Sequence, residues 1–163
     1  MFTWLTTTLV GKIISVFFVS MVPVIELRGG IPIGVGLGLD PILAMVICII
    51  GNIIPVPFII FFIRKIFEWM KKSGTWLGKI VDKLENKVAN KRGKVEKYKL
   101  LGLFLFVAIP LPGTGAWTGA LIAACLNMDK KHSFVSIFLG VLAAGIIVTA
   151  LSYGVASLIW FLA

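Results

Sequence analysis

The stretch from Leu100 to Leu126, LLGLFLFVAIPLPGTGAWTGALIAACL, contains no charged residue and decides the fold. Two apolar runs, Leu100–Ile109 and Ala116–Leu126, flank the segment PLPGTG. Each run is about half as long as a membrane-spanning helix, which needs about 20 residues. A helix cannot continue through the proline and glycine cluster without losing backbone hydrogen bonds. The stretch therefore predicts two half-length helices joined by a break, which together form a helical hairpin.

The first part of the chain has the same form. An apolar run over Ile13–Val22 is followed by a break over Pro23–Pro32 that contains two glycines, and then by a short run over Ile33–Leu39. Non-helical backbone at membrane depth is tolerated only where protein or a water-filled cavity surrounds it. We therefore expect two re-entrant hairpins whose turns meet near the midplane of the membrane.

Composition places the chain in a membrane. Of the 163 residues, 59% are hydrophobic and 14% are charged, and the mean hydropathy is +1.04. A soluble domain usually carries about 25% charged residues, so this chain lacks the polar surface to cover itself in water. The uncharged runs Pro41–Ile63 and Ser133–Ala163 are each long enough to span a bilayer. The predicted fold class is an all-α polytopic membrane protein.

The two halves of the chain resemble each other. Three pairs of residues recur at nearly the same spacing: Pro23 and Pro110, Asp40 and Asp129, and Gly51 and Gly140. Weak internal symmetry of this kind is typical of secondary transporters. We expect a single integral membrane domain over residues 1–163, with repeat 1 over 13–63, a linker over 64–99 and repeat 2 over 100–163. Each repeat is a hairpin followed by a transmembrane helix, and the two repeats are inverted.

The linker carries most of the positive charge. Between Arg64 and Lys99 there are 12 Lys/Arg and 4 Asp/Glu residues. The positive-inside rule places such a segment on the cytoplasmic side, against anionic lipid headgroups. Apolar residues at helical spacing from Leu77 to Val88 predict a basic amphipathic helix on the membrane surface, with a solvated linker as the alternative. No nucleic-acid-binding motif accompanies this charge, so no nucleic acid partner is expected.

The first break contains two ionisable residues, Glu26 and Arg28, in the sequence ELRGGIP. Charges near the middle of a membrane are costly, so they mark a functional site by default. Glu26 is the candidate proton-coupling carboxylate, because burial favours the neutral form of an acid. Arg28 offers a planar fork of donors that suits phosphate or carboxylate. The alternative is an ion pair that only holds the hairpin turn together.

Both breaks also offer backbone groups to a ligand. If the second arm of each hairpin begins at the midplane, its N-terminal amides and positive dipole end point at the site. Pro32 suits the first turn of such an arm, and the glycines on either side of Thr114 would leave N–H groups free to bind an anion. The alternative is that these glycines only let two backbones pack closely. The candidate substrate-binding residues are Arg28, Gly29, Gly30, Pro32, Asn52, Pro112, Gly113, Thr114, Gly115, Trp117 and Thr118.

Asn52 joins this set because it is a polar amide inside the first span. The nearby Pro55 and Pro57 would kink that helix, so this region suits a hinge or a cavity wall. Hydrogen bonding between helices would equally explain Asn52. The sequence holds no Walker motif, no cluster of zinc ligands and no nucleophile elbow. We therefore expect neither an enzyme nor a bound metal or cofactor.

The motifs Glu26–Pro32 (ELRGGIP) and Pro110–Gly119 (PLPGTGAWTG) resemble those of the small multi-drug export protein family of bacterial membrane proteins. The resemblance covers the chain from Ser15 to Gly154. That family is similar to the DedA (SNARE-associated, VTT-domain) superfamily, which implies two facing re-entrant hairpins, a bacterial cytoplasmic (inner) membrane location and movement of lipids such as the undecaprenyl-phosphate carrier. DedA proteins carry arginines in the second hairpin after a Pro-Gly step, where this chain has glycine. The resemblance therefore assigns the acidic and basic roles to Glu26 and Arg28.

Together these features predict a proton-linked transporter or flippase for an amphipathic, anionic, lipid phosphate-like substrate. Glu26 would carry the proton, Arg28 would contact the anion, and the backbone of Gly113–Gly115 would face it. Two hairpins and two spans make a thin wall around a cavity, so a homodimer or higher oligomer is expected. An exporter of small cationic drugs is one alternative. Another is a non-transporting membrane scaffold, which would depend on the basic linker and tolerate changes at Glu26 and Arg28.

Overall fold

The computed structural model describes residues 4–72, 95–111 and 113–162, and this part of the chain is helical, without a β-strand. The helices are α1 (Trp4–Thr7), α2 (Leu9–Met21), α3 (Glu26–Gly36), α4 (Pro41–Ile53), α5 (Pro55–Lys72), α7 (Val95–Ala108), α8 (Ala116–Cys125) and α9 (Lys130–Leu162). Two helical stretches, Pro41–Ile63 and Lys130–Gly154, are long and apolar enough to span a membrane. The predicted all-α class with two spans is confirmed.

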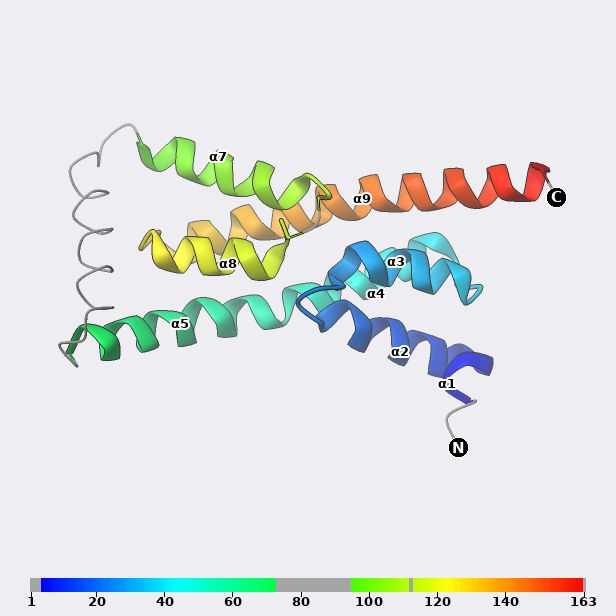
Figure 1. Cartoon of the computed structure of the whole chain (residues 1–163), viewed down its shortest axis with the longest axis horizontal. Coiled ribbons are helices and arrows are strands. Elements are labelled where there is room, and N and C mark those ends of the chain that lie inside the picture. The colour runs from blue at the N-terminus through cyan, green and yellow to red at the C-terminus, as the bar shows by residue number, and fades with distance from the viewer. Residues whose placement is uncertain (1–3, 73–94, 112, 163) are drawn as a thin grey trace.

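Two helical hairpins approach each other from opposite ends of the molecule (Figure 1). The first is α2–α3 and the second is α7–α8, and their turns meet near the middle of the long axis. The consecutive helices α4 and α5 contact both hairpins, and so does α9, which packs on α3, α7 and α8. The fold therefore brings together the two breaks that proline and glycine make in the chain. The inverted relation of the two halves stays a prediction.

The first hairpin differs from the prediction. Its break covers only residues 22–25, and α3 begins at Glu26, so Pro32 lies inside the helix and not in its first turn. The second arm of this hairpin was expected at Ile33–Leu39, but the helix observed there begins seven residues earlier, at Glu26. Gly30 and Gly34 stay helical because they let α3 pack closely on its neighbours, where any Cβ would touch side chains of α2 and α4. Close packing of small residues favours helix association and outweighs the low helix propensity of glycine.

The first span is kinked, as its prolines predict. α4 ends at Ile53 and α5 begins at Pro55, which has no N–H to donate to the carbonyl four residues earlier. The last span is a single helix that begins at Lys130, three residues before its predicted start. Asp129 explains the earlier start, because its Oδ2 accepts a hydrogen bond from His132 N at 3.1 Å and so caps the helix.

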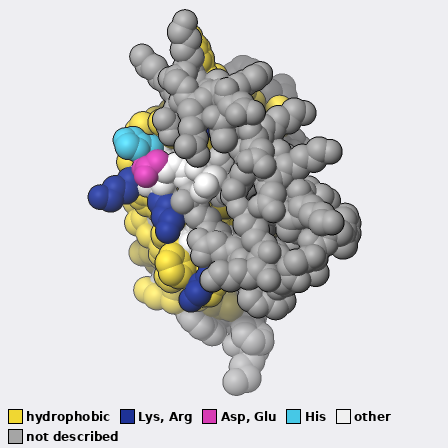
Figure 2. Space-filling model, turned by 90° about the vertical axis from the view of Figure 1, so that its left-hand side faces the viewer, with side chains coloured by type: hydrophobic (Ala, Val, Ile, Leu, Met, Phe, Trp, Pro, Cys, Tyr) yellow, Lys and Arg dark blue, Asp and Glu magenta, His cyan; other side chains and the backbone are white. Residues whose placement is uncertain are grey.

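Lysine side chains gather at the end of the molecule where α9 begins. Figure 2 views this end and shows basic side chains close to the histidine and beside apolar surface. Lys65 of α5 and Lys130 of α9 both lie near the ring of Phe61, with Nζ 5.9 and 5.6 Å from its centroid. The amphipathic helix predicted within the basic linker lies in residues 73–94, outside the described residues.

Candidate functional site

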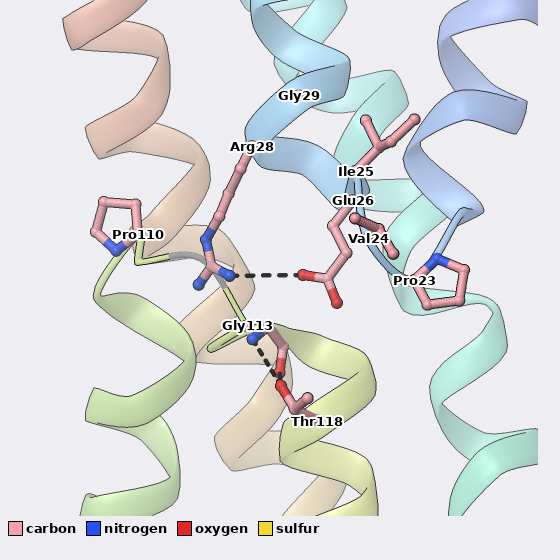
Figure 3. Close-up of a pocket in the computed structure, with 10 residues that line it drawn as sticks. Pro23, Val24, Ile25, Glu26, Arg28, Gly29, Pro110, Gly113 and Thr118 are labelled. Atoms are coloured by element: carbon pink, nitrogen blue, oxygen red, sulfur yellow. Dashed lines mark hydrogen bonds and ion pairs between the residues drawn. The ribbon is translucent and has the colours of Figure 1, made fainter.

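The turns of the two hairpins line a partly open cavity of about 310 Å³ (Figure 3). It lies between the start of α3, the end of α7 and the start of α8. Its lining comes from both breaks: Pro23, Val24, Ile25, Glu26, Arg28 and Gly29 from the first hairpin, and Pro110, Gly113, Gly115 and Thr118 from the second. The cavity is thus a mainly apolar chamber that holds one carboxylate and one guanidinium.

Glu26 reaches from the first hairpin to the second. It is the first residue of α3 and is only 4% exposed. Its backbone has a φ of +50°, a left-handed conformation that is costly for residues other than glycine and is typical of functional sites. Its Oε1 accepts a hydrogen bond from Trp117 N at 3.2 Å. The carboxylate therefore lies at the N-terminal end of α8, where the free amides and the helix dipole favour a negative charge.

Arg28 contacts the opposite kind of helix end. Its Nη2 donates to the carbonyl oxygens of Val107 at 3.2 Å and Ile109 at 3.0 Å, and to that of Thr114. The first two lie at the C-terminal end of α7, where carbonyls lack helical partners and the dipole is negative. Nη1 lies 3.8 Å from Glu26 Oε2. Nε is buried and has no hydrogen-bond partner among the described residues.

The start of α8 is shaped to receive the carboxylate. Gly115 is the residue before the helix and has an extended backbone that any residue can adopt. Glycine matters for space instead, because a Cβ at this position would overlap the Glu26 carboxylate where it now lies. The N–H of Gly115 donates to Thr118 Oγ1 at 2.8 Å. The first amides of α8 are therefore shared between one hydroxyl of its own first turn and a carboxylate from the other hairpin.

The site holds groups for two kinds of chemistry. A carboxylate such as that of Glu26 can exchange a proton with water, and a helix end such as the start of α8 can bind an anion. Helix N-termini bind phosphate, sulfate and carboxylate groups, so the position occupied by Glu26 suits a small oxyanion. The Arg28 guanidinium, with Nη1 3.8 Å from Glu26 Oε2, places a positive charge beside it. No group of three His, Cys, Asp or Glu side chains that could bind a metal occurs in the described ranges.

The structure gathers several of the predicted site residues around the cavity: Glu26, Arg28, Gly29, Gly113, Gly115 and Thr118. Other candidates lie outside its lining. Gly30 packs against Ser20 and Cys48, and Pro32 is exposed on α3. Trp117 contributes its backbone amide, and the position of Pro112 lies outside the described part of the chain.

The backbone amides of Gly113–Gly115 were predicted to bind a substrate anion, but some of them already donate hydrogen bonds within the protein. Thr114 N donates to Leu111 O at 3.2 Å, and Gly115 N donates to Thr118, so neither amide is free. The Thr114 hydroxyl donates to Ile109 O at 2.8 Å and does not line the cavity. Asn52 is fully buried on α4 and also lies outside the lining. The expectation of free amides overlooked that a break in a helix satisfies many of its own groups through local turns.

Sequence reasoning missed part of the site. Pro23 and Pro110 line the cavity, and the sequence signal was their matching position in the two breaks. Val24 and Ile25 line it beside them. The carbonyls that bind Arg28 could not be identified from the sequence, because every residue carries a carbonyl and only the fold decides which ones meet the guanidinium.

Comparison with known proteins gives one match. The model of a family described as "Putative small multi-drug export protein" matches residues 26–147, a range that begins at Glu26 and includes the whole second hairpin. No curated protein and no solved structure matches the chain. The similarity to the DedA superfamily stays a prediction. The matched range covers about three quarters of the sequence, and the chain belongs to the small multi-drug export protein family.

Proposed function

We propose that the protein is a proton-linked membrane transporter that moves an amphipathic anionic substrate, such as a lipid phosphate, past the two hairpin turns. One observation carries the proposal: the Glu26 carboxylate lies at the N-terminus of α8, beside a cavity lined by both turns. An ionisable group at this depth in a membrane protein is costly and calls for a function. Membership of an export family supports transport as the general activity.

The proposed cycle alternates two anions at one helix end. In the structure, the negative carboxylate of Glu26 accepts the hydrogen bond of Trp117 N. Protonation removes the charge that the helix dipole favours, so the carboxyl group can leave and the anionic group of the substrate can bind. Arg28 stays on the carbonyls of Val107 and Ile109, and its guanidinium keeps a positive charge beside that anion. The proton and the substrate anion are therefore bound together and move in the same direction.

The proposed membrane placement inserts the hairpins from opposite sides. The hairpins α2–α3 and α7–α8 would be the re-entrant parts of two inverted repeats, with α4–α5 and α9 as the transmembrane helices. Lysines at the start of α9 favour the cytoplasmic side of the bacterial inner membrane for that end and for the basic linker, which would lie on anionic headgroups. The cavity would then lie near the midplane, where transporters built from inverted repeats bind their substrates. A homodimer or higher oligomer would thicken the wall of this small bundle.

Translocation in proteoliposomes tests the proposal. Vesicles with purified protein and a fluorescent lipid phosphate are compared with empty vesicles, with and without a pH gradient. The wild type should move the lipid, and the gradient should change the rate. Glu26→Gln keeps the shape of the side chain and removes its titration, so it should abolish the response. Asp129→Asn, at the far end of α9, is the control and should behave as wild type. No movement above empty vesicles with folded wild-type protein would overturn the proposal.

The family description favours a second candidate, the export of small cationic drugs. Glu26 would then bind the cation directly, although the Arg28 guanidinium 3.8 Å away opposes a second positive charge. The same vesicles distinguish the two candidates, because efflux of tetraphenylphosphonium without movement of lipid phosphate would favour the cation. A scaffold without transport would move neither compound, and its function would depend on the basic linker.

A further inference from the structure

A fully buried asparagine on α4 lacks a hydrogen-bond partner within the described part of the chain. Asn52 is 0% exposed, and neither Oδ1 nor Nδ2 has a partner among the described residues. A buried amide with both groups unpaired is rare, because it has lost its bonds to water and gained none in return. Such a group points to a partner that binds it in another state of the protein.

The packing of α3 on α4 places Asn52 opposite Glu26. The two helices run antiparallel (Figure 1). Close contacts define two pairs of facing positions, Gly34 with Ala44 and Gly30 with Cys48. Each step along this interface moves four residues down α3 and four residues up α4, which is about one helical turn. The next pair in the same register is Glu26 and Asn52, and both side chains are buried.

Protonation of Glu26 creates a hydrogen-bond donor that needs an acceptor, and Asn52 Oδ1 is one. An ionised carboxylate only accepts hydrogen bonds, and the groups beside Glu26 are donors, namely the amide of Trp117 and the guanidinium of Arg28. Once protonated, Glu26 carries an O–H that neither donor can accept. Asn52 can accept it through Oδ1 while Nδ2 donates to the other carboxyl oxygen, because a primary amide and a carboxylic acid are complementary at two points.

We propose that Asn52 is the positioning residue that receives the Glu26 side chain when its carboxyl group is protonated. The inference rests on the proposed function and adds the second position of its proton carrier. The proton comes from water in the cavity and stays on Glu26, so no covalent bond to Asn52 forms. The movement takes the carboxyl group from α8 to α4 and clears the amide of Trp117 for the substrate anion.

Several other groups near Glu26 are poor acceptors for its proton. Within the described part of the chain, Arg28 is the only charged side chain at ion-pair distance, and a guanidinium cannot accept a hydrogen bond. On α2, the Ser20 hydroxyl already donates to Phe17 O at 2.7 Å. On α4, the Cys48 thiol is a weak acceptor, lies one turn away from Asn52 and packs against Gly30.

Infrared difference spectroscopy of the full-length protein tests this inference, because hydrogen bonding shifts the C=O stretch of a protonated carboxyl group. The Glu26 band is assigned by its loss in Glu26→Gln. In Asn52→Leu, which has a similar volume and no polar group, this band should shift to higher wavenumber as the carboxyl group loses its partner. Asn52→Gln keeps the amide and should return the band toward its wild-type position. Transport should fall about tenfold in Asn52→Leu, because the protonated Glu26 side chain loses both hydrogen bonds that the amide offers.

Cys48→Ala is the matched control, because it alters the same face of α4 one turn away. It should leave both the band and the transport rate unchanged. A band that stays in place in Asn52→Leu, or that moves as far in Cys48→Ala, would overturn the role of Asn52 and leave the proton step at Glu26 intact. The complete lack of a Glu26 carboxylic acid band at any pH would overturn the proton step as well.

Discussion

Gly115→Ala should displace the Glu26 carboxylate from the start of α8. The backbone of Gly115, with φ of −118° and ψ of −170°, is open to alanine, so the substitution adds no backbone strain. The new Cβ would overlap the carboxylate. Glu26 has a flexible side chain and can move its end away, so the overlap itself costs little. The protein loses instead the hydrogen bond from Trp117 N and the approach to Arg28.

The size of this effect follows from these contacts. A hydrogen bond to a charged group contributes about 1.5–3 kcal/mol to the free energy of unfolding. Alanine lowers the conformational entropy of the unfolded chain relative to glycine, and this raises the free energy of unfolding by about 0.4–1 kcal/mol. The expected net loss for Gly115→Ala is therefore about 1–2 kcal/mol. Chemical unfolding in mixed micelles, followed by circular dichroism, measures this difference.

Gly102→Ala on α7 is the control, because a Cβ there meets no atom within 4 Å. It should be neutral or stabilising by up to about 1 kcal/mol. Glu26→Asp withdraws the carboxylate by one methylene, so Gly115→Ala should cost at least about 0.5 kcal/mol less in that background. Equal effects at Gly115 and Gly102, or strict additivity of Gly115→Ala with Glu26→Asp, would refute the reasoning.

Arg28→Lys should lower the free energy of unfolding by about 1–3 kcal/mol, because an ammonium cannot reproduce the planar fork of donors that bonds to the carbonyls of the second hairpin. The same unfolding assay measures this loss, and an unchanged free energy of unfolding would contradict the prediction. Asn52→Leu should raise the free energy of unfolding by about 1–3 kcal/mol even as it slows transport, because it removes a buried unpaired amide; a destabilised variant would argue that the amide is satisfied. Gly140→Ala should destabilise by about 1–3 kcal/mol, because its Cβ would press on Val107 and lie 3.0 Å from Phe104 O, whereas Gly102→Ala should not. Hydrogen bonds from the His132 amide and ring hold the pKa of Asp129 below its usual value. The stability that Asp129 contributes is thus present above about pH 4 and is lost as the pH falls through the lowered pKa. Acid unfolding curves of wild type and Asp129→Asn should differ near neutrality and converge at low pH, and parallel curves would contradict this.

The second hairpin could be predicted closely from the chain alone. Its two arms were expected at Leu100–Ile109 and Ala116–Leu126. In the structure α7 covers Val95–Ala108, so it begins five residues earlier than expected, and α8 covers Ala116–Cys125. The reason is that PLPGTG excludes a helix by local chemistry, whatever packs around it. The first hairpin was harder to predict, because the glycines and proline of ELRGGIP weaken a helix locally. The close packing of α3 on α2 and α4 keeps this segment helical, and such packing cannot be predicted from a local sequence pattern.

The charged residues of the site could be predicted, but their partners could not. Glu26 and Arg28 stand out because ionisable residues are rare in apolar stretches. Their partners are backbone groups of the other hairpin, the amide of Trp117 and the carbonyls of Val107 and Ile109. A sequence does not show which helix end meets which side chain. The amides expected to bind a substrate anion were therefore not recognised as the place where Glu26 itself binds.

Proton movement driven by the substrate tests the central claim most directly. A pH-sensitive dye trapped inside proteoliposomes reports the internal pH after a lipid phosphate is added outside. If Glu26 carries a proton together with the anion, internal pH should fall as the lipid moves inward with wild type and with Asp129→Asn, but not with Glu26→Gln. Lipid movement at constant internal pH, or equal acidification with Glu26→Gln, would contradict the exchange of the Glu26 carboxylate and the substrate anion at the start of α8.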